Sequence, residues 1–146
     1  MTGPDIIVVG GGIAGTSVAA TLASNARVVL IEAEPQPGYH ATGRSAAIFI
    51  RNYGNAVLRA LNAASAPVLH EPEGISETPL LSPRGQMLIA SEDEMPALES
   101  YAQGAAGLER LTSAEVVSLV PILRPETIAA GVVERDAQDI DVDRML

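Results

Sequence analysis

Three glycines near the N-terminus have the spacing of a turn that binds a dinucleotide. A G-x-G-x-x-G pattern begins at Gly10. In such a turn Gly10 permits a tight bend, Gly12 lets the backbone approach a pyrophosphate, and Gly15 lets a following helix pack closely on a strand. The N–H groups that begin this helix point at the phosphates, and the helix dipole favours their negative charge. The candidate pyrophosphate-binding residues are Gly10, Gly12, Ile13, Ala14 and Gly15.

An acidic residue follows at the distance that a dinucleotide site requires. Glu32 comes roughly 20 residues after Gly12 and ends a second apolar run, where a carboxylate accepts hydrogen bonds from ribose hydroxyls. A phosphate on that ribose would be repelled, so the pattern disfavours NADP. The glycine turn alone is a weak signal, but together with Glu32 it predicts a dinucleotide site.

The elements that must position these residues form a strand–helix–strand unit. Residues 6–9 are a short apolar run, residues 27–31 are a second one that begins with an arginine, and residues 13–24 are rich in Ala, Ser and Thr. Uninterrupted apolar runs are typical of parallel strands buried on both faces, and their order predicts a right-handed crossover. An NAD-binding domain would continue to a third parallel strand. Residues 34–43 instead hold two prolines and two glycines and predict a loop, before a second helix start at Ser45.

The remaining elements follow from periodicity, caps and prolines. We expect a helical turn over 44–50, a helix over 55–65, a proline-rich loop over 67–83 and a strand over 86–90. Further on, we expect a helix over 91–102 and a strand over 129–134. Between them, a helix should start with the 112–115 capping box and end at Pro121. A last helix should begin at Val142, with Asp141 as its cap.

Composition excludes several classes of function. Nine basic and 18 acidic residues give a net charge of −9, which argues against nucleic acid and anionic membranes as partners. The absence of cysteine excludes disulfides, thiolate metal sites and thiol catalysis. No apolar run approaches the roughly 18 residues of a membrane span, and the N-terminus lacks the basic start of a signal peptide. We therefore expect a cytoplasmic protein with no membrane span.

Two further groups of polar residues can be explained by ordinary structural roles. The aspartates at 136, 139, 141 and 143 lack the glycine turn and the terminal glutamate of a calcium loop, so we expect no metal site. His40 is expected to make a structural hydrogen bond. Arg44 either contacts a phosphate or caps the loop against Glu34, and the residues alone leave both open.

Residues 36–40 (Gln-Pro-Gly-Tyr-His) and 42–47 (Thr-Gly-Arg-Ser-Ala-Ala) resemble the flavoprotein group that contains D-amino-acid oxidase, glycine oxidase and sarcosine oxidase. Residues 80–84 and 139–141 are similar to the same group, and the resemblance covers essentially the whole chain. Within the group, the chain looks closest to the bacterial D-arginine dehydrogenases. The resemblance implies FAD as cofactor, a small-molecule amino acid or amine as substrate, and hydride transfer from the substrate α-carbon to flavin N5.

The resemblance also implies roles for individual residues. It places the pyrophosphate on the glycine turn and the adenine ribose on Glu32, with Ala33 beside it. Tyr53 and Ile48 would lie at the lid of the substrate site, but relatives carry a histidine where this chain has Ile48, which weakens the case for a basic D-amino acid. No catalytic residue is identifiable in this segment. The residues that would wrap the pyrophosphate and ribityl chain are Ala41, Thr42, Gly43, Arg44, Ser45, Ala46, Ala47 and Ile48.

The expected fold is α/β, with a Rossmann-like FAD-binding βαβ unit and the beginning of an α+β substrate domain, incomplete at the C-terminus. Residues 1–66 would form the FAD-binding segment, 67–135 the start of a substrate or cap domain, and 136–146 the start of a truncated helix that returns to the FAD domain. By itself the chain is expected to bind FAD weakly or not at all.

Three functions remain open. The first is an FAD-dependent oxidoreductase of the D-amino-acid dehydrogenase or oxidase type. The second is an FAD-binding module without activity of its own, truncated or dependent on another chain for a C-terminal half. The third is an NAD-dependent oxidoreductase, which would need a third Rossmann strand soon after residue 50.

Overall fold

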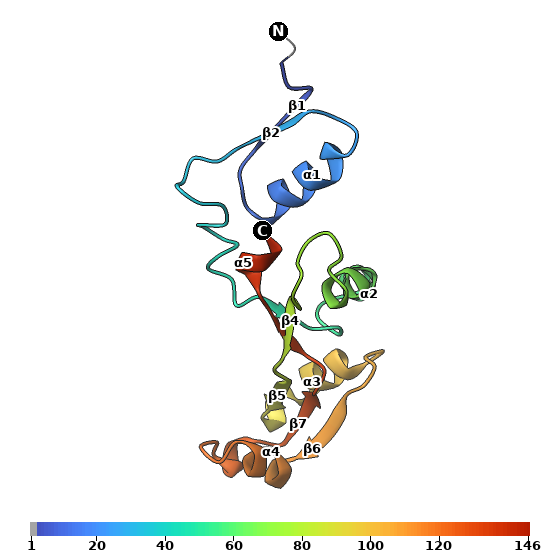
Figure 1. Cartoon of the computed structure of the whole chain (residues 1–146). Coiled ribbons are helices and arrows are strands. Elements are labelled where there is room, and N and C mark those ends of the chain that lie inside the picture. The colour runs from blue at the N-terminus through green and yellow to red at the C-terminus, as the bar shows by residue number, and fades with distance from the viewer. Residues whose placement is uncertain (1–2) are drawn as a thin grey trace. The chain divides into compact units, whose positions relative to one another are not determined.

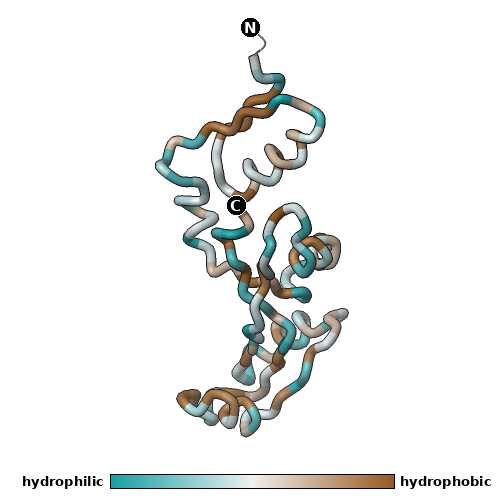
Figure 2. The backbone as a smooth tube through the Cα atoms, in the orientation of Figure 1, coloured by the Kyte–Doolittle hydropathy of each residue, from teal (hydrophilic) through white to brown (hydrophobic). Residues whose placement is uncertain are grey.

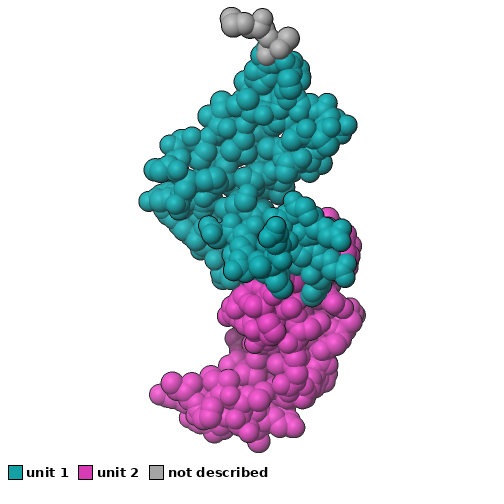
Figure 3. All heavy atoms as spheres, viewed as in Figure 1, with its two compact units in different colours: residues 1–47, 68–80, 140–146 teal, residues 48–67, 81–139 magenta. Residues whose placement is uncertain are grey.

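The chain folds into a mixture of helices and short strands (Figure 1). The computed structural model describes residues 3–146. They divide into two compact units, which are coloured separately in Figure 3. Unit 1 comprises the chain up to Ala47 together with Val68–Leu80 and Ile140–Leu146, and unit 2 comprises Ile48–Pro67 and Leu81–Asp139.

Unit 1 contains the predicted strand–helix–strand. Strands β1 (Ile6–Val9) and β2 (Val28–Ile31) pair in parallel, and helix α1 (Ile13–Ala23) connects them. Both strands are among the strongly apolar stretches of the tube in Figure 2. Val8 faces α1, because its Cγ1 lies 3.5 Å from the Cβ position of Gly15. These two strands and this helix confirm the predicted order.

Only one face of this two-stranded sheet is covered. The strands alternate between half-buried residues and exposed ones, whereas the apolar runs predicted burial on both faces. Parallel strands normally bury both faces, and α1 supplies cover for one. The exposed side chains, which share the other face, are Ile7, Val9, Val29 and Ile31.

The end of unit 1 confirms one further prediction. Helix α5 (Val142–Met145) begins after Asp141, whose carboxylate accepts a hydrogen bond from the Arg144 N–H at 3.1 Å.

The prediction of a helical turn over residues 44–50 is wrong, because these residues form turns and bends and then strand β3 (Ile48–Phe49).

The largest sheet of unit 2 is antiparallel. Its strand order is β5 (Gln86–Ala90), β7 (Ala130–Glu134), β6 (Glu109–Thr112). A 3-10 turn, η1 (Glu92–Glu94), leads into α3 (Met95–Ala102), and α4 (Ser113–Leu119) follows β6 directly. The predicted capping box is present in α4: Thr112 and Glu115 bond reciprocally to each other's backbone N–H.

Alternate residues of β7 supply two apolar cores on opposite faces of this sheet. Val132 packs in a cluster with Leu98 of α3, and Val133 packs in a cluster with Val116 of α4. A Cβ at Gly131 would lie 2.8 Å from Val116 Cγ2, so α4 rests directly on the backbone of the central strand. The sheet is therefore covered on both faces, and its central strand is the most buried part of the unit.

The other elements depart from prediction in three ways. Helix α2 (Ala56–His70) continues through Pro67 instead of ending near residue 65. The segment expected to be loop up to residue 83 contains strand β4 (Leu81–Pro83), which joins β3 and β8 (Gln138–Ile140) in a second sheet of order β3–β8–β4. Strand β6 and the 3-10 turn η2 (Pro125–Thr127) were also not expected. No helix within residues 3–146 is long and apolar enough to cross a membrane.

Candidate functional site

The glycine turn joins β1 to α1 and requires glycine for a positive φ at Gly10 and for space at Gly15. Gly10 has a φ of +103° and its N–H bonds to the Ile31 carbonyl oxygen at 2.8 Å. A Cβ at Gly15 would lie 1.9 Å from the Gly10 carbonyl oxygen. Glycine at position 15 is therefore what allows α1 to begin so close to the end of β1, as the spacing of the motif requires.

The start of α1 receives its hydrogen-bond acceptor from a distant segment. The residue that caps the helix is Gly12, which offers no side chain. The Ile13 N–H instead donates to Thr42 Oγ1 at 3.1 Å, and a Cβ at Gly12 would lie 3.1 Å from that same oxygen. A polar oxygen thus fits against the N-terminus of α1, where backbone N–H groups and the helix dipole favour a negative charge.

Glu32 follows β2 and binds three backbone N–H groups. Its Oε2 accepts from Gly11 at 2.5 Å, and its Oε1 accepts from Ala33 at 2.7 Å and Glu34 at 3.0 Å. The bonds from the Glu34 and Gly11 N–H groups hold the pKa of this carboxyl below its ordinary value. A carboxylate has about four acceptor positions, so Oε2 keeps one for a hydroxyl group.

Gly11 is a residue whose role sequence reasoning missed, because the motif treats it as a spacer. Its N–H is the donor to Glu32, and a Cβ there would lie 3.0 Å from Glu32 Oε2. Three consecutive glycines, where the motif needs two of them, were the available signal. Gly11 therefore links the glycine turn to the acidic residue.

The segment that follows β2 returns to the glycine turn. The Gly38 N–H donates to the Gly11 carbonyl oxygen at 2.9 Å, and the Gly43 N–H donates to the Gly38 carbonyl oxygen at 2.7 Å. A Cβ at Gly43 would lie 2.5 Å from the Gly38 oxygen, so this tight turn also requires glycine. These bonds place residues 41–47 beside the start of α1.

The charged groups of this segment divide into a pair and an unpaired cation. His40 Nε2 lies 2.7 Å from Glu34 Oε1, so the histidine makes a side-chain hydrogen bond within the loop. That contact uses the carboxylate that Arg44 was a candidate to cap. The Arg44 guanidinium lies over the Tyr39 ring, 5.5 Å from its centroid, and within residues 3–146 no ion pair is found for it.

A cavity of about 270 Å³ lies at this place. Ala47 ends the segment at a φ of +42°, the left-handed region that alanine rarely adopts, and its carbonyl oxygen accepts from the Ile140 N–H at 2.7 Å. Strained backbone of this kind is concentrated at ligand-binding segments. The residues that line the cavity are Ile13, Ala41, Thr42, Ser45, Ala47, Ile140, Val142 and Met145.

The structure therefore brings most of the predicted site residues together in unit 1, around the glycine turn. The two lid candidates belong to unit 2. Ile48 is half-buried in β3 opposite Asp139, and Tyr53 is exposed in the turn that follows. The residues gathered in unit 1 are Gly10, Gly12, Ile13, Ala14, Gly15, Glu32, Ala33, Ala41, Thr42, Gly43, Arg44, Ser45, Ala46 and Ala47.

This arrangement suits an anion attached to a sugar. Helix N–H groups, the Thr42 and Ser45 hydroxyls and the unpaired Arg44 can bind a pyrophosphate, and Glu32 Oε2 can accept from a ribose hydroxyl. In the described chain no three His, Asp or Glu residues are grouped to hold a metal ion. Asp139 instead pairs with Arg84 at 2.8 Å.

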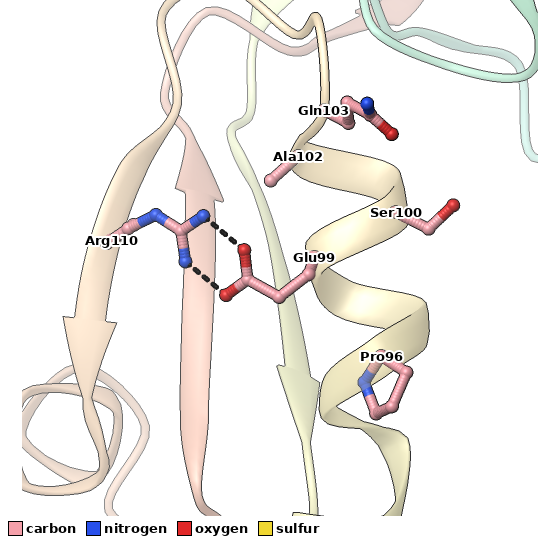
Figure 4. Close-up of a pocket in the computed structure, with 6 residues that line it drawn as sticks. All are labelled: Pro96, Glu99, Ser100, Ala102, Gln103 and Arg110. Carbon is pink, nitrogen blue, oxygen red and sulfur yellow. Dashed lines mark hydrogen bonds and ion pairs between the residues drawn. The ribbon is translucent and has the colours of Figure 1, made fainter.

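Unit 2 has a hollow of its own, between α3 and β6 (Figure 4). Its charged residues, Glu99 and Arg110, face each other through two hydrogen bonds of 2.6 Å each, and the bond from Arg110 lowers the pKa of Glu99. These two side chains are satisfied by each other, so the pair ties the helix to the strand.

Comparison with known proteins gives a family match. The family model described as DAO, FAD dependent oxidoreductase, matches residues 5–146. The family description names FAD, whereas the third hypothesis required NAD.

Solved structures give the same fold. An L-α-glycerophosphate oxidase from Mycoplasma pneumoniae, reduced with dithionite and with FAD bound, has a TM-score of 0.79 at 18% identity and covers 97% of this chain and 40% of its own. Glycine oxidase from Geobacillus kaustophilus has a TM-score of 0.74 at 22% identity, covering 97% and 42%. L-Amino acid deaminase from Proteus myxofaciens, in complex with anthranilate, has a TM-score of 0.72 at 16% identity, covering 99% and 35%. The chain thus spans about two-fifths of the length of these proteins.

Proposed function

The chain belongs to the DAO family of FAD-dependent oxidoreductases, and from this premise we propose that unit 1 holds the adenine and pyrophosphate half of FAD in an enzyme that oxidises an amino acid or amine. The observation that carries the proposal is the convergence of three segments on the start of α1. Gly11 bonds to Glu32, Gly38 bonds to Gly11, and Ile13 bonds to Thr42.

Each group in the site contributes to the binding of FAD. The N-terminus of α1 and Arg44 neutralise the pyrophosphate, and the Thr42 and Ser45 hydroxyls donate to its oxygens. Glu32 is ionised at neutral pH, as its lowered pKa requires, and it accepts from the adenine ribose. When bound, FAD supplies the acceptor, flavin N5, for the hydride that leaves the substrate α-carbon.

For the substrate we propose an amino acid of the D series. The support for the D series is the resemblance of residues 36–47 to D-amino-acid dehydrogenases and oxidases. Two of the similar structures are named for enzymes of amino acids, a glycine oxidase and an L-amino acid deaminase, and they support an amino acid without favouring the D series. Loss of a hydride from the α-carbon and a proton from the amino group leaves an imino acid, which water hydrolyses to an oxo acid and ammonia. Ile48 is apolar, so the expected substrate has an uncharged side chain.

A second role is an FAD-binding module that acts only with another polypeptide. The exposed face of the β1–β2 sheet favours it, because Val9 is 82% exposed and its neighbours on that face are apolar. A polypeptide that covered this face would bury it as parallel sheets require. In both roles the cofactor site is the same, and they differ in whether the chain alone oxidises a substrate.

Anaerobic addition of substrates to the FAD-saturated protein tests the proposal. D-Alanine, D-arginine, glycine, L-proline and glycerol 3-phosphate are added separately while the visible flavin absorption is followed. Bleaching by D-alanine in preference to D-arginine is the expected result. Bleaching by glycerol 3-phosphate alone contradicts an amine substrate. Bound FAD that every substrate leaves oxidised, until a native extract is added, supports the second role.

A further inference from the structure

Arg44 differs from most other arginines of the chain in what holds its guanidinium. The nine basic residues are all arginines, among 18 acidic residues. Six arginines form ion pairs with Asp or Glu side chains, and these are Arg27, Arg51, Arg84, Arg110, Arg135 and Arg144. Within residues 3–146 no ion pair or hydrogen bond is found for the Arg44 guanidinium, which lies over the Tyr39 ring, 5.5 Å from its centroid. An arginine that stays free of carboxylates in a chain of net charge −9 needs a structural cause.

The contact with Tyr39 holds the guanidinium without using its hydrogen-bond donors. A cation over an aromatic face is attracted by the ring quadrupole, whereas the five N–H donors of arginine lie in the plane of the guanidinium. Arg59 provides a contrast, because it lies over the Tyr101 ring at 5.9 Å but also donates to three backbone carbonyl oxygens. The donors of Arg59 are therefore occupied, and those of Arg44 are kept for a ligand.

The Tyr39 ring is itself held by a neighbour that also binds a carboxylate. The rings of Tyr39 and His40 meet edge to face, with centroids 5.1 Å apart and planes at 86°. His40 Nε2 lies 2.7 Å from Glu34 Oε1. These contacts form one row of side chains in the order Glu34, His40, Tyr39, Arg44. Because His40 binds the carboxylate of this row, the guanidinium at its other end has no acidic partner within it.

The backbone places Arg44 beside the start of α1. Its N–H donates to the His40 carbonyl oxygen at 3.1 Å, and the Ser45 N–H donates to the Thr42 carbonyl oxygen at 3.3 Å. The Thr42 hydroxyl oxygen accepts from the N–H of Ile13, the first residue of α1. Thr42 and Ser45 also line the cavity of about 270 Å³. The arginine with free donors therefore lies in the turn between two hydroxyl residues of the candidate pyrophosphate site.

We propose that Tyr39 and His40 are positioning residues that keep the Arg44 guanidinium available to the phosphates of FAD. Tyr39 holds the guanidinium by its face, which reduces the side-chain entropy that arginine loses when it binds an anion. His40 binds the Glu34 carboxylate, which would otherwise compete with the phosphates for Arg44. This inference rests on the proposed function, in which Arg44 binds the pyrophosphate. Neither Tyr39 nor His40 touches the cofactor.

The first test measures the hold of Tyr39 on Arg44 in the chain without cofactor. The heteronuclear NOE of the arginine Nε–H groups, which reports motion on the ps–ns timescale, is compared for the parent protein, Tyr39→Phe and Tyr39→Leu. Arg44→Lys identifies the Arg44 signal by its disappearance. Arg59 is the internal control, because its hydrogen bonds to carbonyl oxygens should keep it ordered in every variant.

The expected result is an ordered Arg44 in the parent protein and in Tyr39→Phe, which keeps the ring, and a mobile Arg44 in Tyr39→Leu. An Arg44 that is equally ordered, or equally mobile, in the parent protein and in Tyr39→Leu overturns the proposal. An equal loss of order at Arg59 also overturns it, because the effect would then be general destabilisation. Circular dichroism identifies any variant that fails to fold, and Tyr39→Phe is the conservative member of the set.

The second test measures the binding of ADP, which carries the adenine ribose and a pyrophosphate but no flavin. Shifts of the backbone N–H signals during the titration give the dissociation constant. We expect Tyr39→Leu to raise it about threefold, the effect of an exposed cation–π contact, and Tyr39→Phe to leave it unchanged. In an Arg44→Ala background Tyr39→Leu should have no further effect, because the ring acts through the guanidinium. A further loss in that background contradicts the positioning role of Tyr39.

His40 is tested through the carboxylate that it binds. We expect His40→Ala to raise the dissociation constant for ADP about threefold, because the released Glu34 carboxylate pairs with Arg44 with the strength of an exposed ion pair. Glu34→Gln added to His40→Ala should restore the parent value, because the competing charge is then absent. The matched control adds Glu71→Gln instead, which removes the same charge elsewhere in unit 1. Restoration by both substitutions, or by neither, overturns the role given to His40.

Arg44→Ala distinguishes failure of the positioning roles from failure of the proposed function. The proposed function predicts that this substitution weakens ADP binding about tenfold, by loss of a charged hydrogen bond. If it does so while Tyr39→Leu and His40→Ala have no effect, the cofactor site stands and the positioning roles are wrong. If it leaves ADP binding unchanged, Arg44 does not bind the pyrophosphate, which contradicts the proposed function at this residue even where Tyr39 orders the side chain.

Discussion

At Gly15 one methyl group decides whether the cofactor site can form. Its Cβ would stand 1.9 Å from the Gly10 carbonyl oxygen, a backbone atom that cannot move without separating α1 from β1. We expect Gly15→Ala to lower the free energy of unfolding by about 3 kcal/mol, the upper range for overpacking, and to abolish FAD binding. Urea unfolding measures the first effect. Gly3→Ala is the control, because a Cβ at Gly3 meets nothing within 4 Å.

Glu32 makes a prediction about pH. Its pKa is lower in the folded chain, chiefly through the Glu34 and Gly11 N–H groups. Its contribution to stability is therefore complete above the ordinary glutamate pKa of about 4.3 and is lost as pH falls through the lower folded pKa. We expect Glu32→Gln to remove this part of the pH dependence and to weaken FAD binding about tenfold, by loss of a charged hydrogen bond.

Thermal unfolding of the Glu32 variant across acidic pH, together with an FAD titration at neutral pH, checks both effects. Glu71→Gln, in the loop after α2, serves as the matched control and should change neither. A variant that binds FAD as tightly as the parent protein would show that Glu32 does not contact the ribose.

At the scale of elements, the capping box of α4 can be tested by itself. Thr112 Oγ1 accepts from the Glu115 N–H, and the Glu115 carboxylate returns a bond to the Thr112 N–H at 2.8 Å. We expect Thr112→Ala to lower the stability of unit 2 by about 1 kcal/mol, because one orphan N–H at the helix start loses its acceptor. Urea unfolding followed by circular dichroism is the measurement. Ser100→Ala, on the exposed face of α3, should have little effect, and an equal loss there would contradict the capping account.

Some elements could be predicted because their information is local. The apolar runs of β1, β2 and β5, and the caps of α4 and α5, lie within a few residues of one another in the sequence. Strands β3, β6 and β8 have two to four residues each and form only because partners elsewhere in the chain pair with them. Pro67 removes one N–H donor from α2, and a helix already formed can continue past a single lost bond.

The same division holds for the candidate site. The glycine spacing and Glu32 could be recognised from the sequence, because the motif carries its own geometry. The bond from Ile13 to Thr42 could not, because it joins residues 29 positions apart. Such contacts depend on how loops return to the elements, which local patterns do not encode.

At the scale of the whole molecule, six carboxyl groups have pKa values below their ordinary ones. Hydrogen bonds, led by Arg partners or by backbone N–H groups, lower the pKa of Asp5, Glu32, Glu94, Glu99, Glu109 and Glu115. The unfolded chain therefore binds more protons in acid than the folded one, and stability must fall as pH drops below about 4. Thermal midpoints measured between neutral pH and pH 3 check this, and a midpoint that rose in acid would contradict the ion-pair assignments.

Titration of the purified chain with FAD, followed by quenching of flavin fluorescence, tests the central claim most directly. Acid release and chromatography of any cofactor that copurifies accompany it. Because unit 1 is proposed to hold the adenine and pyrophosphate half, we predict weak, saturable binding at one site, competition by ADP, none by FMN, and loss of binding in Gly15→Ala. Competition by FMN in place of ADP, or FAD binding that Gly15→Ala leaves unchanged, would contradict the assignment of the glycine turn and Glu32 to this cofactor.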